Sequence, residues 1–188
     1  MTVTTAGVDL YWLPLGAGGH SVRLNGRVFE WVEARRAGRE TRALYHSALE
    51  VALGSERFVI EVGPVSRGPH GVVATSAVGS GLAGRARVFR YEVRCWAGGS
   101  IPDLAEAVDS PRRVSGDPMV ARSVLELAPR VPVPVWGRDE LGAGEMWNSN
   151  SVVAWLLVSA GIDAERIELP AGGRAPGWDA GIVVARRG

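Results

Sequence analysis

The fold of this 188-residue chain is decided by the stretch ALYHSALEVAL-GSE-RFVIEV, residues 43–62. Two runs rich in β-branched and other apolar residues lie on either side of Gly54-Ser55-Glu56, a short segment typical of a tight turn. Runs joined in this way predict a β-hairpin with strands over 43–53 and 57–62. We therefore expect the chain to be built around an antiparallel sheet.

Further strand signals lie on both sides of this hairpin. Residues 8–15 form an apolar, β-rich segment, and Asn25-Gly26 predicts another hairpin over 21–29. Polar and apolar residues alternate from 87 to 96, which is the period of a half-buried strand, and Cys95 falls on its apolar face. These segments enlarge the predicted sheet.

The second half of the chain changes to helical signals. The sequence predicts a short helix over 100–108, a second over 117–128 and a third over 148–161, with an extended proline-rich connector at 131–135. An apolar segment at 181–185 predicts a closing strand. Strands followed by helices indicate an α+β class, an antiparallel sheet packed against a few helices in a single domain over residues 1–188.

Composition narrows the classes of partner. Hydrophobic residues make up 46% of the chain, charged residues 22%, and the formal net charge is +1, so no strong field attracts nucleic acid or an anionic membrane. The longest apolar run, 152–158, is too short to span a bilayer, and the first residues do not have the pattern of a signal peptide. We expect a cytoplasmic protein.

Neither a metal nor a cofactor is expected. The single cysteine, Cys95, excludes a cysteine-based cluster, and the spacing of His, Asp and Glu does not suggest a metal site. The glycine-rich segment 79–84 does not lie between a strand and a helix with the GK[ST] ending of a phosphate loop, and the chain contains no lysine.

The most informative candidate site is the turn Trp147-Asn148-Ser149-Asn150-Ser151, which opens the apolar run 152–158. Small polar residues at a helix start place a hydroxyl near unpaired N–H groups and the positive helix end, which suits a nucleophile beside an oxyanion site. Asn and Ser are also the preferred N-cap residues for purely structural reasons. Both interpretations remain open from the residues alone.

His46 is the best candidate for a general base, because the predicted strand around it would hold the imidazole rigidly. Glu61, on the partner strand of the hairpin, lies within a few residues of the position opposite His46. A carboxylate there would orient the imidazole, as in a catalytic triad. A solvated Glu61 and a structural His46 are the competing interpretations.

These stretches resemble the circularly permuted papain-like proteins, among them the permuted relatives of NlpC/P60 peptidases, the lecithin:retinol acyltransferase-like enzymes and the PPPDE deubiquitinase-like peptidases. Residues 45–51 look like the histidine strand of that group, and Asn148-Ser149-Asn150 looks like its nucleophile turn. The resemblance covers about residues 43–160. It implies Ser149 as nucleophile, His46 as base and Glu61 as orienting group. The family usually has Cys at the nucleophile position, where this chain has Ser.

The resemblance implies hydrolysis or acyl transfer at an amide, ester or thioester bond, with helix N–H groups holding the oxyanion. The alternative is a catalytically inactive domain that binds a peptide or a small acyl-bearing molecule in the inherited cleft. In both cases Trp147, Asn148 and Asn150 are expected to contact the ligand. A third class, a structural module that binds a protein partner, would lack a pocket between the His46 strand and the helix at Ser149.

Overall fold

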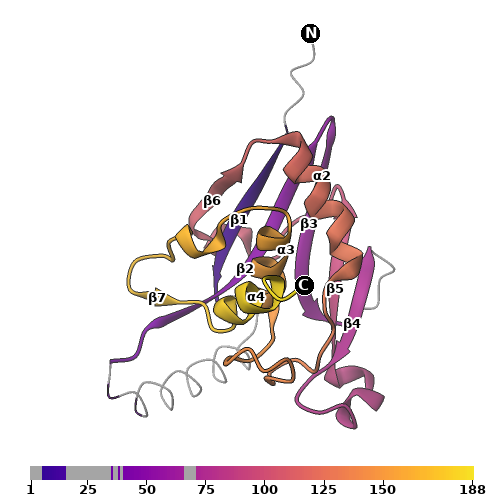
Figure 1. Ribbon diagram of the computed structural model, residues 1–188, viewed down its shortest axis with the longest axis vertical. Helices are drawn as coiled ribbons and strands as arrows, with labels where there is room; N and C mark the ends of the chain where they lie inside the picture. The colour runs from indigo at the N-terminus through magenta and orange to yellow at the C-terminus, as the bar shows by residue number, and fades with distance from the viewer. Residues whose placement is uncertain (1–5, 16–34, 36–37, 39, 66–70) are drawn as a thin grey trace.

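The computed structural model describes residues 6–15, 35, 38, 40–65 and 71–188, and it has the α+β architecture predicted from the sequence (Figure 1). In this part of the chain, three α-helices lie against one face of an antiparallel sheet. They are α2 (Pro118–Leu127), α3 (Ser149–Ser159) and α4 (Trp178–Ala185). We call the sheet face that they cover the helix face and the opposite one the far face.

The main sheet has the strand order β4-β5-β3-β2-β1-β6, and each neighbouring pair is antiparallel. A very short strand, β7, pairs in parallel with the beginning of β2. The bounds are β1 Gly7–Pro14, β2 Ala43–Leu53, β3 Glu56–Pro64, β4 Val72–Ala77, β5 Arg90–Ala97, β6 Val108–Ser115 and β7 Gly173–Arg174.

The predicted hairpin over residues 43–62 is confirmed by β2 and β3. Leu53 pairs with Glu56, and Gly54 takes a left-handed conformation (φ 68°), as tight hairpin turns require. The ladder between these strands ends at the pair Leu49–Ile60. Beyond that pair, β2 continues beside β1 and β3 continues beside β5, so the backbone of β2 loses its neighbour on one side.

The helix face carries the larger core. Trp12, Leu49 and Ile60 from the sheet pack with α2, α3 and α4, and the rings of Trp12 and Trp178 lie 4.9 Å apart between centroids. A smaller buried cluster, containing Leu13, lies on the far face; its residues are Tyr11, Leu13, Ala48, Val59 and Ile101. Alternating residues of one strand thus enter two different clusters, as the period of a strand demands.

Two of the expected elements are wrong in type. The expected helix over 100–108 contains just the short turn η3 (Leu104–Glu106), and strand β6, which was not predicted, follows it. Because β6 is the strand beside β1 at the end of the sheet and has irregular register, it can contain Pro111, which is unusual inside a strand.

The expected strand over 181–185 is instead helix α4. Its apolar residues pack against α3, where a Cβ at Gly181 would collide with the carbonyl oxygen of Ser151. Tertiary packing therefore outweighs the β-branched character of Ile182 and Val183. The expected hairpin over 21–29 lies outside the described residues.

Among the helices of the described part of the chain, each is too short or too polar to cross a membrane.

Candidate functional site

Asn148 caps helix α3 with its own side chain. The Asn148 Oδ1 accepts a hydrogen bond from the backbone N–H of Asn150 at 2.9 Å, and Ser151 Oγ accepts one from the backbone N–H of Asn148 at 3.0 Å. Together they form a capping box, which satisfies N–H groups that have no partner within the helix. The N-cap interpretation of the turn is therefore confirmed for Asn148 and Ser151.

Asn150 connects the start of α3 to the sheet. Its side chain is 3% exposed, and its Oδ1 accepts a hydrogen bond from Ser47 Oγ at 2.9 Å. Its Nδ2 donates to the carbonyl oxygens of Tyr45, at 3.0 Å, and Pro176, at 2.9 Å. One buried amide thus joins β2, α3 and the loop before α4.

The bond to Tyr45 forms where β2 has lost its neighbour. The carbonyl oxygen of Leu44 bonds the N–H of Leu15 on the β1 side, so the next carbonyl, that of Tyr45, points toward the side that β3 has left. A buried carbonyl without a partner would be costly. Asn150 supplies the missing donor there.

The loop before α4 lies directly on the same turn. Asn148 Nδ2 donates to the carbonyl oxygen of Pro176 at 2.9 Å, and Ser151 Oγ donates to that of Gly177 at 2.7 Å. Gly177 has a φ of 85°, and a Cβ there would come within 2.7 Å of Ser151 Oγ, so glycine is needed for both conformation and space. We call this set, Ser47, Asn148, Asn150, Ser151, Pro176 and Gly177, the polar junction.

Ser149 differs from its neighbours in the turn. It is half-buried, and its hydroxyl makes no hydrogen bond with the described residues. Trp147 is 2% exposed and packs in the helix-face core, so it does not line a groove as expected from the sequence. Its indole Nε1 has no hydrogen-bond partner among the described residues. Asn150 is likewise buried, so it cannot contact a ligand without leaving its partners.

His46 lies on the far face, away from Ser149. It stands directly opposite Leu13, a member of the far-face cluster, and opposite residues of an antiparallel pair share a face. Its neighbours Tyr45 and Ser47 face the helices instead. Burial lowers the pKa of His46 to about 4, although the carboxylate of Asp103 opposes that shift. The imidazole is therefore neutral at pH 7.

Glu61 shares the far face with His46, but its partner is an arginine. Its carboxylate accepts a hydrogen bond from Arg94 Nη1 at 3.0 Å, across the β3–β5 ladder. Burial raises the pKa of Glu61, and the Arg94 guanidinium opposes the shift. The expected Ser149–His46–Glu61 arrangement is thus not formed: the sheet separates the hydroxyl from the imidazole, and Arg94 holds the carboxylate.

Two important residues did not stand out in the sequence. Ser47 follows the expected base and is the residue that reaches helix α3. The available signal was that Ser47 and Leu49, two positions apart on a strand, must lie on the same face, and that Leu49 is apolar. Arg94 is one of the polar residues that alternate with apolar ones over 87–96. Pairing this strand with the strand that contains Glu61 would have revealed the ion pair.

Other chemistry is limited in the part of the chain that the structure describes. No group of three or more His, Cys, Asp and Glu side chains there could hold a metal ion. Burial raises the pKa of the Cys95 thiol, so this half-buried group stays protonated and weakly nucleophilic at pH 7.

Comparison of the chain with family models, curated proteins and solved structures found no match.

Replacing Asn150 by Ala should destabilise the protein strongly. The change leaves the Tyr45 carbonyl and the Ser47 hydroxyl buried without a partner, so we expect a loss of about 2–4 kcal/mol in the free energy of unfolding. The matched control is Ser149→Ala in the same turn, which removes no hydrogen bond and should change stability by less than about 0.5 kcal/mol. Urea denaturation followed by tryptophan fluorescence measures both. Equal losses would contradict the assigned roles.

The depressed pKa of His46 predicts that stability falls with acid. Between pH 4 and pH 6.5, His46 binds a proton in the unfolded chain, where its pKa is 6.5, but not in the folded chain, where its pKa is about 4. The stability that the neutral His46 contributes is fully present above pH 6.5 and is lost as the pH falls to 4. The loss in the free energy of unfolding amounts to about 3 kcal/mol at most. His46→Gln should lose less stability over this interval than the unmodified protein. A histidine pKa near 6.5, assigned to His46 by NMR titration, would contradict this.

Proposed function

We propose that this chain is a non-catalytic, ligand-binding domain of the permuted papain-like kind, and that it takes a peptide or a small acyl-bearing molecule. The order of the motifs supports the family: a histidine strand in a hairpin, followed by an Asn-Ser-Asn turn at the start of a later helix. The packing of α3 against β2, the strand that carries the histidine, supports it as well.

The position of His46 carries the choice of binding over catalysis. A serine hydroxyl is a weak nucleophile unless a base lies within hydrogen-bond reach. His46, the predicted base, faces away from Ser149 across the sheet, and its partner Leu13 belongs to the far-face cluster. The hydroxyl therefore lacks the activation that the predicted mechanism assigned to His46.

The register of β2 makes this arrangement hard to reverse. Turning His46 toward the helices would require a shift of one residue, because strand side chains alternate. The same shift would carry Ser47 to the far face and break its hydrogen bond to Asn150. Hydrolysis or acyl transfer by Ser149 with His46 as its base would therefore require the polar junction to break.

The surface beside Ser149 supports a polar ligand. The Ser149 hydroxyl stands in the first turn of α3, where helix N–H groups concentrate positive charge. Close by, the carboxylate of Glu145 accepts a hydrogen bond from the N–H of Gly177 at 2.7 Å. Burial raises the pKa of Glu145, and the charges of Asp179 and Arg174 act on it in opposite directions. Groups of both signs suit the amides and termini of a peptide.

The Ser149→Cys variant separates the two functions. If no imidazole serves position 149, adding His46→Ala should shift the pKa of the introduced thiol by less than about 0.3 units; removal of a paired base should shift it by about one unit or more. The pH dependence of alkylation by iodoacetamide gives this pKa. Fluorophosphonate labelling of the unmodified protein that disappears in Ser149→Ala would overturn the proposal.

Binding itself can be tested with a library of N-acetylated tetrapeptides and N-acyl amino acids. We expect amide chemical shifts of residues 145–151 to change on addition of members of the library. Ser149→Phe, which puts a bulky ring at the first turn of α3, should abolish these changes, whereas Arg122→Gln on the exposed side of α2 should preserve them. Absence of shifts at residues 145–151 with every member of the library would contradict the binding function.

A further inference from the structure

The two end strands of the main sheet differ in their chemistry. Strand β6 closes one end with the sequence VDSPRRVS, which contains a proline and three charged residues. Proline and charge are among the features that keep an edge strand from pairing with another chain. Strand β4 closes the other end with the sequence VVATSA, which contains neither. An end strand of this kind invites pairing unless another segment covers it.

The backbone of β4 has bonding groups on its outer side. The N–H of Val78, directly after β4, donates to the carbonyl oxygen of Phe89 at 2.8 Å, so Val78 and, two positions earlier, Ser76 direct their peptide groups toward β5. The intervening residues Thr75 and Ala77 direct theirs to the outer side. These outer groups are what another strand would use to extend the sheet.

Residues 131–136, which we call the proline connector, lie along this outer side. The N–H of Trp136 donates to the carbonyl oxygen of Ala77 at 2.8 Å, and the N–H of Gly79 donates to the carbonyl oxygen of Trp136 at 2.9 Å. These two bonds form a parallel bridge between Val78 and Trp136. The connector therefore already occupies the outer carbonyl of Ala77.

The side chain of Ser76 holds the connector where proline interrupts its backbone donors. The Ser76 hydroxyl donates to the carbonyl oxygen of Pro134 and lies 3.2 Å from that of Val133. Ser76 is 8% exposed, so its hydroxyl depends on these carbonyl groups for a partner. Because Pro134 has no N–H to offer a ladder, a side chain replaces the backbone bond at this point.

The connector is itself a poor template for a further strand. Pro132 and Pro134 have no N–H, and the N–H of Val135 donates to Glu140 Oε2 at 2.8 Å. Val133, between the two prolines, is 52% exposed. An approaching strand would meet apolar side chains but few backbone donors, so pairing would leave its own carbonyl groups without partners.

We propose that the proline connector is an edge guard, which keeps this end of the sheet from pairing with the same end of a second copy of the chain. An uncharged strand can pair with its own copy in antiparallel fashion without bringing like charges together, so β4 would be self-complementary without the guard. The connector prevents this by bonding Ala77 and by presenting prolines to the outside. This role does not depend on a ligand at Ser149.

Replacing both prolines, Pro132→Thr with Pro134→Thr, tests the guard. The change gives the connector N–H groups on an extended backbone, so each copy gains an edge that another can extend. We expect the association constant from sedimentation equilibrium to rise at least about tenfold, because backbone hydrogen bonds then form between copies. The matched control, Pro102→Thr with Pro118→Thr, makes the same change at two exposed prolines outside the connector and should not alter association.

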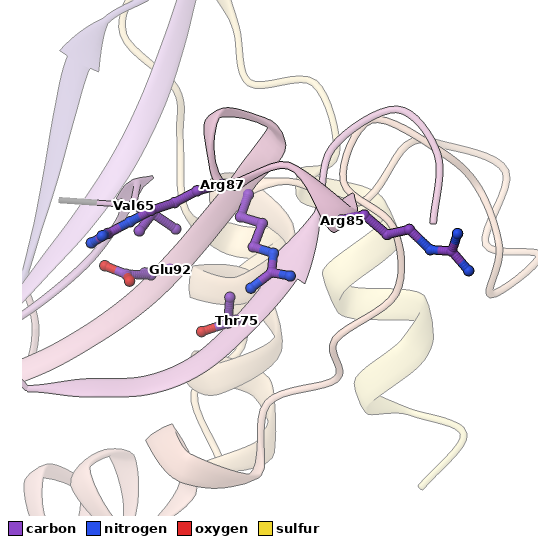
Figure 2. A pocket seen from close by; sticks show the side chains of 6 residues that line it. Val65, Thr75, Arg85, Arg87 and Glu92 are labelled. Carbon is purple, nitrogen blue, oxygen red and sulfur yellow. The ribbon is translucent and has the colours of Figure 1, made fainter. Parts of the chain in front are cut away.

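Ser76→Ala is the second variant, because it releases the connector from β4 without changing the connector itself. It should also raise the association constant, and adding Thr75→Lys should reverse the rise, since pairing would then bring like charges together. A pocket of about 390 Å³ opens beside the exposed Thr75, which leaves room for the longer side chain (Figure 2). Met119→Lys on α2, at a residue 69% exposed, adds the same charge elsewhere and should not reverse it.

Circular dichroism checks that each variant is folded. The proposal is overturned if the folded double-threonine variant and folded Ser76→Ala both associate no more than the unmodified protein. It is also overturned if Met119→Lys suppresses association as well as Thr75→Lys does, if the control prolines have the same effect as the connector prolines, or if Thr75→Lys alone dissociates the unmodified protein.

Discussion

The buried carboxamide of Asn150 holds together three parts of the chain that are far apart in sequence. It accepts from Ser47 on β2 and donates to the carbonyl oxygens of Tyr45 and Pro176. At 3% exposure, water cannot take over these bonds. Because α4 packs on α3, the amide fixes the position of both helices against the sheet. The capping box and the conformation of Gly177 depend on the same placement.

The bond between Ser47 and Asn150 also decides where His46 points. Side chains alternate along β2, so the residue after the imidazole can reach α3 when the imidazole faces the other side. The turn at the start of α3 thereby serves as structure: the side chains of Asn148, Asn150 and Ser151 are hydrogen-bonded, whereas the Ser149 hydroxyl and the Trp147 indole Nε1 have no partner among the described residues. The polar junction consequently lies on the opposite face of the sheet from His46.

Local signals in the sequence predicted much of the fold. The hairpin at Gly54, the N-cap of α3 and the helix opened by Asp117 each follow from a few adjacent residues, and each is present. The elements that differ are decided by distant partners. Strand β6 exists because β1 offers it an edge, and α4 is helical because Gly181 allows close contact with α3.

The site was harder to predict for the same reason. The sequence shows that Tyr45, Ser47 and Leu49 share one face of β2. Which face of the strand meets the helices is decided by long-range packing. The Glu61 carboxylate could be placed on the hairpin, whereas its pairing with Arg94 required knowledge that β5 lies beside β3. Trp147 followed the general tendency of tryptophan to pack in the core.

The polar junction also constrains the order in which the chain can fold. The bond from Ser47 to Asn150 spans 103 positions, and the bond from Asn150 to Tyr45 spans 105. Closing so long a loop is entropically expensive until other contacts have shortened it, and topologies rich in such contacts fold slowly. The hairpin of β2 and β3 forms from neighbours in sequence. The Tyr45 carbonyl then stays hydrated until the last third of the chain, which contains Asn150, packs against the hairpin.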